Sequence, residues 1–118
     1  MRRPLNSREQ QELTCLLDAR TALGRAADIA DSGTPKVGDE RLLALAYAML
    51  TFGEMLKQAS RGAVTIAFSG PIALRDKLAH IPHRKINPEV LTASVARATD
   101  EILPLVQARI QDLTAKGE

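Results

Sequence analysis

The feature that most constrains the fold is a broad stripe of apolar residues between positions 40 and 60. Apolar side chains recur there every three or four residues, a spacing that gathers them on one side of an α-helix. We therefore predict a helix over residues 40–60 and expect it to be the most buried element. Gly53 lies within it and is unfavourable by about 1 kcal/mol relative to alanine, which indicates close packing of another helix there. The stripe consists of Leu42, Leu45, Ala46, Met49, Leu50, Gly53 and Leu56.

The N-terminal part of the chain predicts a second long helix. Ser7 and Gln10 have the spacing of a capping box, with Ser7 as N-cap, and apolar residues at helical spacing follow them. We place this helix over residues 8–31. Residues 32–38 are rich in turn-forming types, and Asp39 is suited to cap the helix over residues 40–60.

A short third helix is predicted over residues 71–80. Pro71 is typical of a first helical turn, and Pro82 ends the helix because the residue before a proline is disfavoured in the helical region. The apolar stretch over residues 63–68 has no assignment from its pattern.

The last helix is predicted over residues 88–115. Asn87 can act as its N-cap and Pro88 suits its first position. Pro104 lies inside this helix and should kink it or split it in two. Four or five helices with short connections predict an all-α bundle.

Composition agrees with a single helical domain. The chain has 118 residues, and aromatic residues are only 3% of it, so the core must consist of aliphatic side chains, which favours helices over a β-sandwich. Cys15 is the only cysteine, so no intrachain disulfide can form and a cytoplasmic location is expected. The N-terminus has no apolar segment typical of a signal peptide. The longest apolar run, residues 42–50, is shorter than the roughly 20 residues that span a membrane.

Cations gather around both histidines of the chain in residues 74–86. Four basic residues and one acid give this window a formal charge of +3, whereas the whole chain carries +2. Arginine pairs with phosphate oxygens, and imidazole transfers protons near neutral pH, so the window suits chemistry on a phosphate. Its charged and titratable residues are Arg75, Asp76, Lys77, His80, His83, Arg84 and Lys85.

Arg75 and His80 are the candidate catalytic residues. They lie about 140° apart around a helix of 3.6 residues per turn, so they do not share one face. His80 falls in the last turn, where the helix dipole favours imidazolium, and Arg75 can stabilise charge that develops on a phosphate. The structural alternative is an ion pair of Arg75 with Asp76 and a histidine that only complements the dipole. No residues have metal-ligand spacing, and no cofactor is expected.

Three segments resemble the HepT-like branch of the HEPN superfamily, small all-α proteins with an R-x4-6-H motif. They are residues 75–80 (RDKLAH), 86–91 (INPEVL) and 103–105 (LPL). The pair Gly53-Glu54 and the proline-kinked last helix also match the family. The resemblance covers about residues 13–110.

The resemblance implies an up-and-down four-helix bundle that forms a homodimer. The third helices of two copies would meet and line one cleft with two Arg–His pairs. It further implies metal-independent RNA cleavage, with His80 accepting the proton of the 2′-hydroxyl and Arg75 stabilising the phosphate. Asp76 either orients an active-site group or is a capping or solvated acid. Many members are toxins neutralised by a nucleotidyltransferase-type antitoxin.

One position departs from the family pattern. The toxin branch usually has a tyrosine two residues after the histidine, where the partner attaches AMP, and this chain has Pro82. The only tyrosine, Tyr47, falls in the apolar stripe, so modification at the usual position is impossible. Neutralisation would then work by binding or at another position.

Other residues have two open interpretations. Lys77, His83, Arg84 and Lys85 contact RNA phosphates or are simply solvated, and Glu54 faces the cleft or, as we expect, is an exposed helix residue. The alternative function is a non-catalytic helical module that docks a nucleotidyltransferase.

Overall fold

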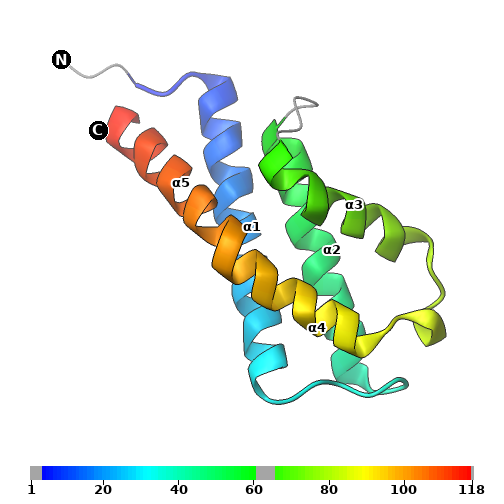
Figure 1. The fold of residues 1–118 in the computed structure, drawn as a ribbon. Helices are drawn as coiled ribbons and strands as arrows, with labels where there is room; N and C mark the ends of the chain where they lie inside the picture. Colours follow the sequence, from blue (N-terminus) through cyan, green and yellow to red (C-terminus); the bar gives the residue numbers. More distant parts are fainter. Residues whose placement is uncertain (1–3, 61–65, 118) are drawn as a thin grey trace.

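α2 (Glu40–Ser60) is the central helix, and α1 (Ser7–Asp31) lies antiparallel beside it (Figure 1). The structure, a computed structural model, describes residues 4–60 and 66–117. All regular elements in these two ranges are helical. The chain runs down α1, up α2, down α3 and up the last helix, so the predicted four-helix bundle is confirmed. No helix in the described ranges is long and apolar enough to cross a membrane.

The core fills the space between α1, α2 and the last helix. It is mainly aliphatic, as the composition predicts. Its buried members include Leu16, Leu23, Leu42, Leu45, Met49, Phe52, Leu56, Leu91, Val95, Val106, Ile110 and Leu113.

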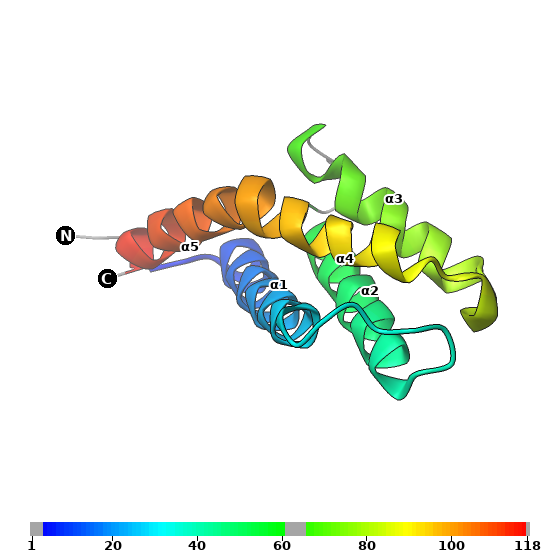
Figure 2. The ribbon, with the colours of Figure 1, turned by 60° about the horizontal axis from the view of Figure 1, so that its bottom comes forward.

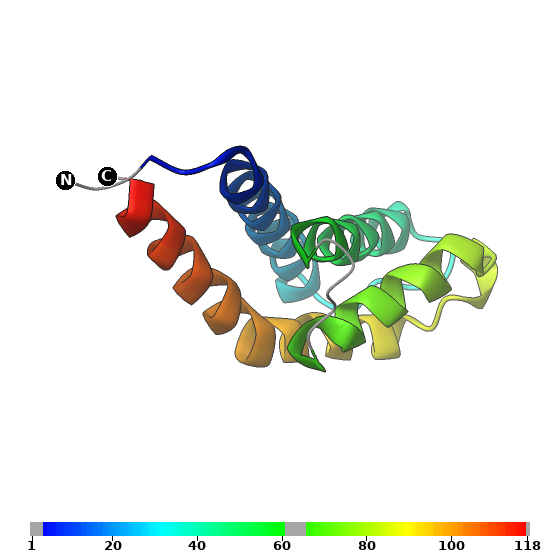
Figure 3. The same ribbon diagram turned by 90° about the horizontal axis from the view of Figure 1, so that it is seen from above.

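The last helix is continuous but bent. α4 (Pro88–Arg97) leads through a wider π-helical turn, η2 (Ala98–Ile102), into α5 (Leu103–Gly117). The Leu103 N–H donates to the carbonyl of Ala98, five residues earlier. Pro104 follows and has no N–H to donate, so the wide turn lets the helix continue past it. Figure 3 shows the resulting bend, and the predicted kink is confirmed.

α3 (Ile66–His80) begins five residues earlier than predicted. The prediction took Pro71 as a first-turn residue, but it lies inside the helix. Its missing N–H removes only the bond to the carbonyl of Ala67, and the helix continues on both sides. Of the unassigned apolar stretch, residues 66–68 belong to α3, and residues 63–65 lie outside the described ranges.

Gly53 allows α3 to pack directly on α2. A Cβ atom at Gly53 would lie 2.5 Å from the carbonyl oxygen of Pro71 and 2.6 Å from the Cβ of Arg75. The close helix packing predicted at this glycine is therefore confirmed. Figure 2 shows that α2 separates α3 from α1, so one side of α3 is left uncovered.

The N-cap of α1 is Asn6 and not Ser7. The Asn6 side chain accepts from the Glu9 N–H at 2.8 Å, and the Glu9 carboxylate accepts from the Asn6 N–H at 3.2 Å. The same capping-box spacing occurs one residue earlier than predicted, and the carboxylate of Glu9 is the stronger acceptor. Asp39 caps α2 as predicted, because its side chain accepts from the Arg41 N–H at 2.9 Å.

Tyr47 is exposed, with 71% of its surface accessible, although the sequence places it among the apolar residues of α2. The unbroken apolar run over residues 42–50 covers all sides of α2, whereas other helices cover only part of it. Leu43, one turn earlier, is also 44% exposed. Both side chains therefore lie on the uncovered side of α2.

Candidate functional site

Arg75 on α3 is held between two acids. Its Nε lies 2.7 Å from Oε2 of Glu54 on α2, and its Nη1 donates to Oδ1 of Asp76 at 2.8 Å. The Nε and Oε2 atoms are shielded from solvent, but the N–H is poorly aligned with the oxygen, so this contact is an ion pair without a formed hydrogen bond. The guanidinium is thus held by Glu54 of α2 and by Asp76 of its own helix.

The position of Glu54 follows from Gly53. Because Gly53 lets α3 approach α2, the next residue along α2 reaches the arginine one turn after Pro71. The Glu54 side chain is only 28% exposed, so the expectation that it is an exposed helix residue is wrong. The Gly-Glu pair was the signal for this contact in the sequence.

Both groups of the Arg75–Asp76 pair are stabilised in their charged forms. The hydrogen bond from Arg75 lowers the pKa of Asp76, partial desolvation opposes this shift, and the nearby cations Lys57 and Arg75 lower the pKa further. The pKa of Arg75 is raised, chiefly by its hydrogen bond to Asp76. The pair therefore stays ionised at neutral pH.

His80 lies at the exposed C-terminal end of α3. It lines a shallow hollow with Asp76, Lys77 and Pro82, together with Ala73 and Ile81. Arg75 faces α2 and does not line this hollow. The two candidate catalytic residues are therefore not brought together within one chain, as their separation around the helix predicts, and Asp76 contacts both regions.

The candidate RNA-binding residues fall into two places. Lys77 is exposed and lines the hollow of His80. Arg84 and Lys85 are exposed and line a separate groove beyond the turn η1 (His83–Lys85). The backbone of His83 belongs to this turn, and its side chain lies outside the described part of the structure.

A more enclosed cavity of about 270 Å³ lies between α2, α3 and the bent last helix. It contains neither Arg75 nor His80. Its walls are mostly apolar, with Arg97 and Glu101 among the lining residues. We do not place the chemistry there, because no paired titratable side chains in it resemble an acid–base site. In the described part of the chain, no three His, Cys, Asp or Glu side chains cluster as metal ligands.

Comparisons of this chain with protein-family models, with curated proteins and with solved structures gave no match. The resemblance to the HepT-like branch therefore rests on the residues of the sequence alone.

Proposed function

We propose that the chain is a metal-independent endoribonuclease, the toxin-like member of a HEPN/nucleotidyltransferase toxin–antitoxin pair. The observation that carries the proposal is the position of Arg75. Glu54 and Asp76 hold its guanidinium in place, and Asp76 also borders the hollow that contains His80. A fixed cation and a titratable imidazole on one basic, exposed helix end suit catalysis on a phosphodiester.

The proposed reaction is transfer of a phosphodiester to the neighbouring 2′-oxygen. His80 accepts the proton of the 2′-hydroxyl, the oxygen attacks the adjacent phosphorus, and the bond to the 5′-oxygen breaks. A proton from imidazolium or water goes to the leaving oxygen, and the products carry 2′,3′-cyclic phosphate and 5′-hydroxyl ends. Arg75 stabilises the charge that develops on the non-bridging oxygens.

A homodimer is part of the proposal, because Arg75 and His80 face different directions within one chain. α3 packs mainly on α2, and its other side is uncovered. Pairing of two α3 helices about a twofold axis makes the contact self-complementary. The family resemblance implies that such pairing brings Arg75 of one copy near His80 of the other.

The proposed antitoxin neutralises the nuclease by binding. Pro82 has no hydroxyl group to accept a nucleotide at the position where the family pattern has tyrosine. The partner is a nucleotidyltransferase-type protein, as the family resemblance implies.

The second candidate is a non-catalytic module that docks a nucleotidyltransferase. The observation in its favour is that two acids already neutralise Arg75 in the free chain. This candidate predicts a stable complex with the partner and no nuclease activity of the isolated protein.

Cleavage of total and transfer RNA by the purified protein in EDTA tests the proposal. We expect His80→Ala and Arg75→Ala each to lose at least about 100-fold in rate, with unchanged helical content by circular dichroism. Arg25→Ala, which removes an exposed cation of α1, is the control and should cleave at the parent rate. No cleavage by a folded dimer would favour the docking module, and full activity of both variants would refute the site.

Mixing the two inactive variants tests whether the site is shared between subunits. If Arg75 of one copy acts with His80 of the other, a mixed dimer contains one intact site. Random exchange of subunits should then restore about a quarter of the parent rate. A pair that acts within one chain gives no restoration.

A further inference from the structure

A groove lies where the loop between α1 and α2 meets the segment that follows α3. Residues 34–37 form one bank and residues 84–89 form the other, around a volume of about 600 Å³. Lys36, Arg84 and Lys85 are exposed cations along it, and Glu89 is the acid among its lining residues. Within the described ranges, none of these three cations forms an ion pair. Their charge is therefore available to an anionic ligand.

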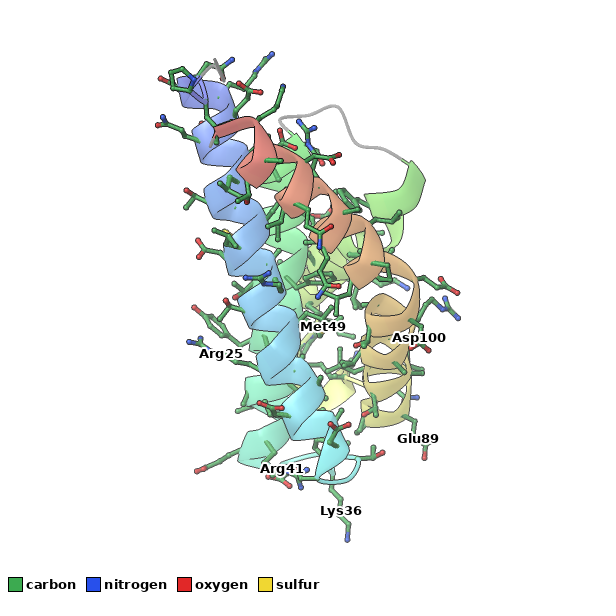
Figure 4. All side chains as sticks on the ribbon, turned by 90° about the vertical axis from the view of Figure 1, so that its left-hand side faces the viewer. Arg25, Lys36, Arg41, Met49, Glu89 and Asp100 are labelled. Carbon is green, nitrogen blue, oxygen red and sulfur yellow. The ribbon has the colours of Figure 1, made fainter. Side chains whose placement is uncertain are left out.

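Hydrogen bonds from Arg41 hold the start of the loop that forms the first bank. The Nη2 of Arg41 donates to the carbonyl of Gly33 at 2.6 Å, to Oγ of Ser32 at 2.7 Å and to the carbonyl of Ile29 at 3.1 Å. Pro35 is fully buried and anchors the middle of the loop. Figure 4 shows Lys36 projecting from this loop at the end of the molecule. The residues that precede Lys36 are thus anchored by these hydrogen bonds and by the buried Pro35.

The second bank is anchored in a similar way. The Lys85 N–H donates to the carbonyl of Pro82 at 2.9 Å, which closes the turn η1, and Ile86 is buried in the core. The Asn87 side chain accepts from the N–H groups of Glu89 and Val90 and fixes the start of α4. Arg84 and Lys85 therefore project from a segment that is tied at both ends.

We propose that this basic groove (residues 34–37 and 84–89) binds the phosphodiester backbone of single-stranded RNA, with Lys36 as a phosphate contact. The inference rests on the proposed function and adds the path of the RNA. Pro82 borders the hollow of His80, and Arg84 begins the groove two residues later. A strand cleaved at His80 can therefore continue directly into the groove.

The lining of the groove favours phosphates over bases as the recognised groups. Its described lining residues include no aromatic side chain on which a base could stack. Phosphate contacts position a strand without reading its sequence. We therefore expect binding that depends strongly on salt and weakly on sequence.

Fluorescence anisotropy with a labelled single-stranded RNA of about 12 nucleotides tests this proposal in the His80→Ala background, in which the RNA stays intact. Lys36→Ala should weaken binding roughly three- to tenfold and reduce the salt-dependence slope by about 0.7. The pair Arg84→Ala and Lys85→Ala should act more strongly. The matched control removes two exposed cations of α1, Arg20 and Arg25, and should leave affinity within about twofold of the background protein.

Equal affinity of the groove variants and the control, or no RNA binding by the background protein, would overturn the proposal. The proposal would also be overturned if Lys36→Ala weakened binding to vesicles with about 30% phosphatidylserine and left binding to RNA unchanged. The cleavage assay separates the two proposals. If the parent cleaves RNA but Lys36→Ala binds RNA normally, only the proposal for the groove is refuted. If binding depends on Lys36 but the parent does not cleave RNA, the groove is supported and the proposed nuclease activity is refuted.

Discussion

In the described part of the molecule, two arginines pair with carboxylates of another helix, and they do so in different ways. Arg109 on α5 donates through Nε and Nη2 to both oxygens of Glu12 on α1, at 2.7 and 2.9 Å. Arg75 on α3 meets Glu54 with a poorly aligned Nε–H and turns its Nη1 to Asp76. The first arrangement has the forked geometry of a well-formed Arg–carboxylate pair, whereas the second divides one guanidinium between two acids.

The two arginines lie in parts of the fold that are held together differently. α1 and α5 are joined by the Glu12–Arg109 pair and by Lys116, which donates to Glu9 at 2.6 Å. α3 packs mainly on α2, through the contact at Gly53. We infer that Arg109 serves stability and that Arg75 serves the site beside His80.

The largest expected effect on stability comes from filling the contact at Gly53. In Gly53→Ala the new Cβ meets a backbone carbonyl and another Cβ, and neither can rotate away. Overpacking of this kind costs about 1–3 kcal/mol and is offset in part by the helix-propensity gain of about 1 kcal/mol, so we expect a net destabilisation of up to about 2 kcal/mol in urea unfolding.

Gly24→Ala is the matched control, because a Cβ at Gly24 on α1 meets nothing within 4 Å. It should stabilise the chain by up to about 1 kcal/mol. Equal stability of Gly53→Ala and the parent would show that α3 is not held by this contact.

Neutralising Glu54 and neutralising Glu12, each in its own variant, should have different effects: the first on RNA cleavage and the second on stability. Glu54→Gln releases Arg75, and we expect RNA cleavage to fall about 10- to 100-fold because a displaced catalytic group loses orientation. Glu12→Gln should leave cleavage unchanged and lower the free energy of unfolding by less than about 1 kcal/mol, since the Arg109 side chain is 42% exposed. The opposite pattern would assign the functional role to Arg109.

A double-mutant cycle on Glu12 and Arg109 should give a coupling energy of about 0.5–1 kcal/mol. The pair is bidentate but partly exposed, which limits its contribution. The coupling is measured from urea unfolding of Glu12→Ala, Arg109→Ala and the double variant at low salt, and it should decrease in high salt. A coupling of zero would leave the two helices held by packing alone.

The smallest effect is expected from the pH dependence of Asp76. Its pKa lies below the ordinary value of 3.8 because Arg75 donates a hydrogen bond to it. A carboxyl whose pKa is lower in the folded than in the unfolded chain stabilises the fold above its ordinary pKa, and this contribution is lost as the pH falls through the lowered value. Asp76→Asn should therefore be slightly less stable than the parent at neutral pH, and the two urea midpoints should converge once the pH is below the lowered pKa of Asp76. A difference that persists there would point to another cause.

The local signals of the sequence predicted most of the helix ends. Asp39, Asn87 and Pro104 act through their own neighbours in the chain, so α2, α4 and the bend lie where the pattern placed them. The start of α3 was missed because Pro71 has the same local signature in a first turn as in a helix that tolerates one lost bond. The broad stripe of α2 did not reveal which side of the helix stays uncovered, and Tyr47 lies on that side.

Contacts between distant residues lay beyond the local pattern. Glu12 and Arg109 are 97 positions apart, and neither residue carries a signal for the other. Glu54 and Arg75 were both noted, the first for its place beside Gly53 and the second for its motif, but their pairing depends on how α3 crosses α2. Lys36 drew no attention as a binding residue, because its loop meets residues 84–89 only in the folded chain.

The ends of the described chain lie close together, so the order of the helices along the chain can be changed by circular permutation. Leu5 is so close to Gly117 that a Cβ there would lie 3.1 Å from its Cγ, and Figure 1 shows both ends on the side of the molecule away from the loop that carries Lys36. A short peptide linker can therefore join them, and the circular chain can be reopened between α2 and α3. α3 would then be the first helix of the permuted protein and would no longer follow α2 in the chain. Whether it still docks at Gly53 would show how far its place depends on contacts alone and how far on connectivity.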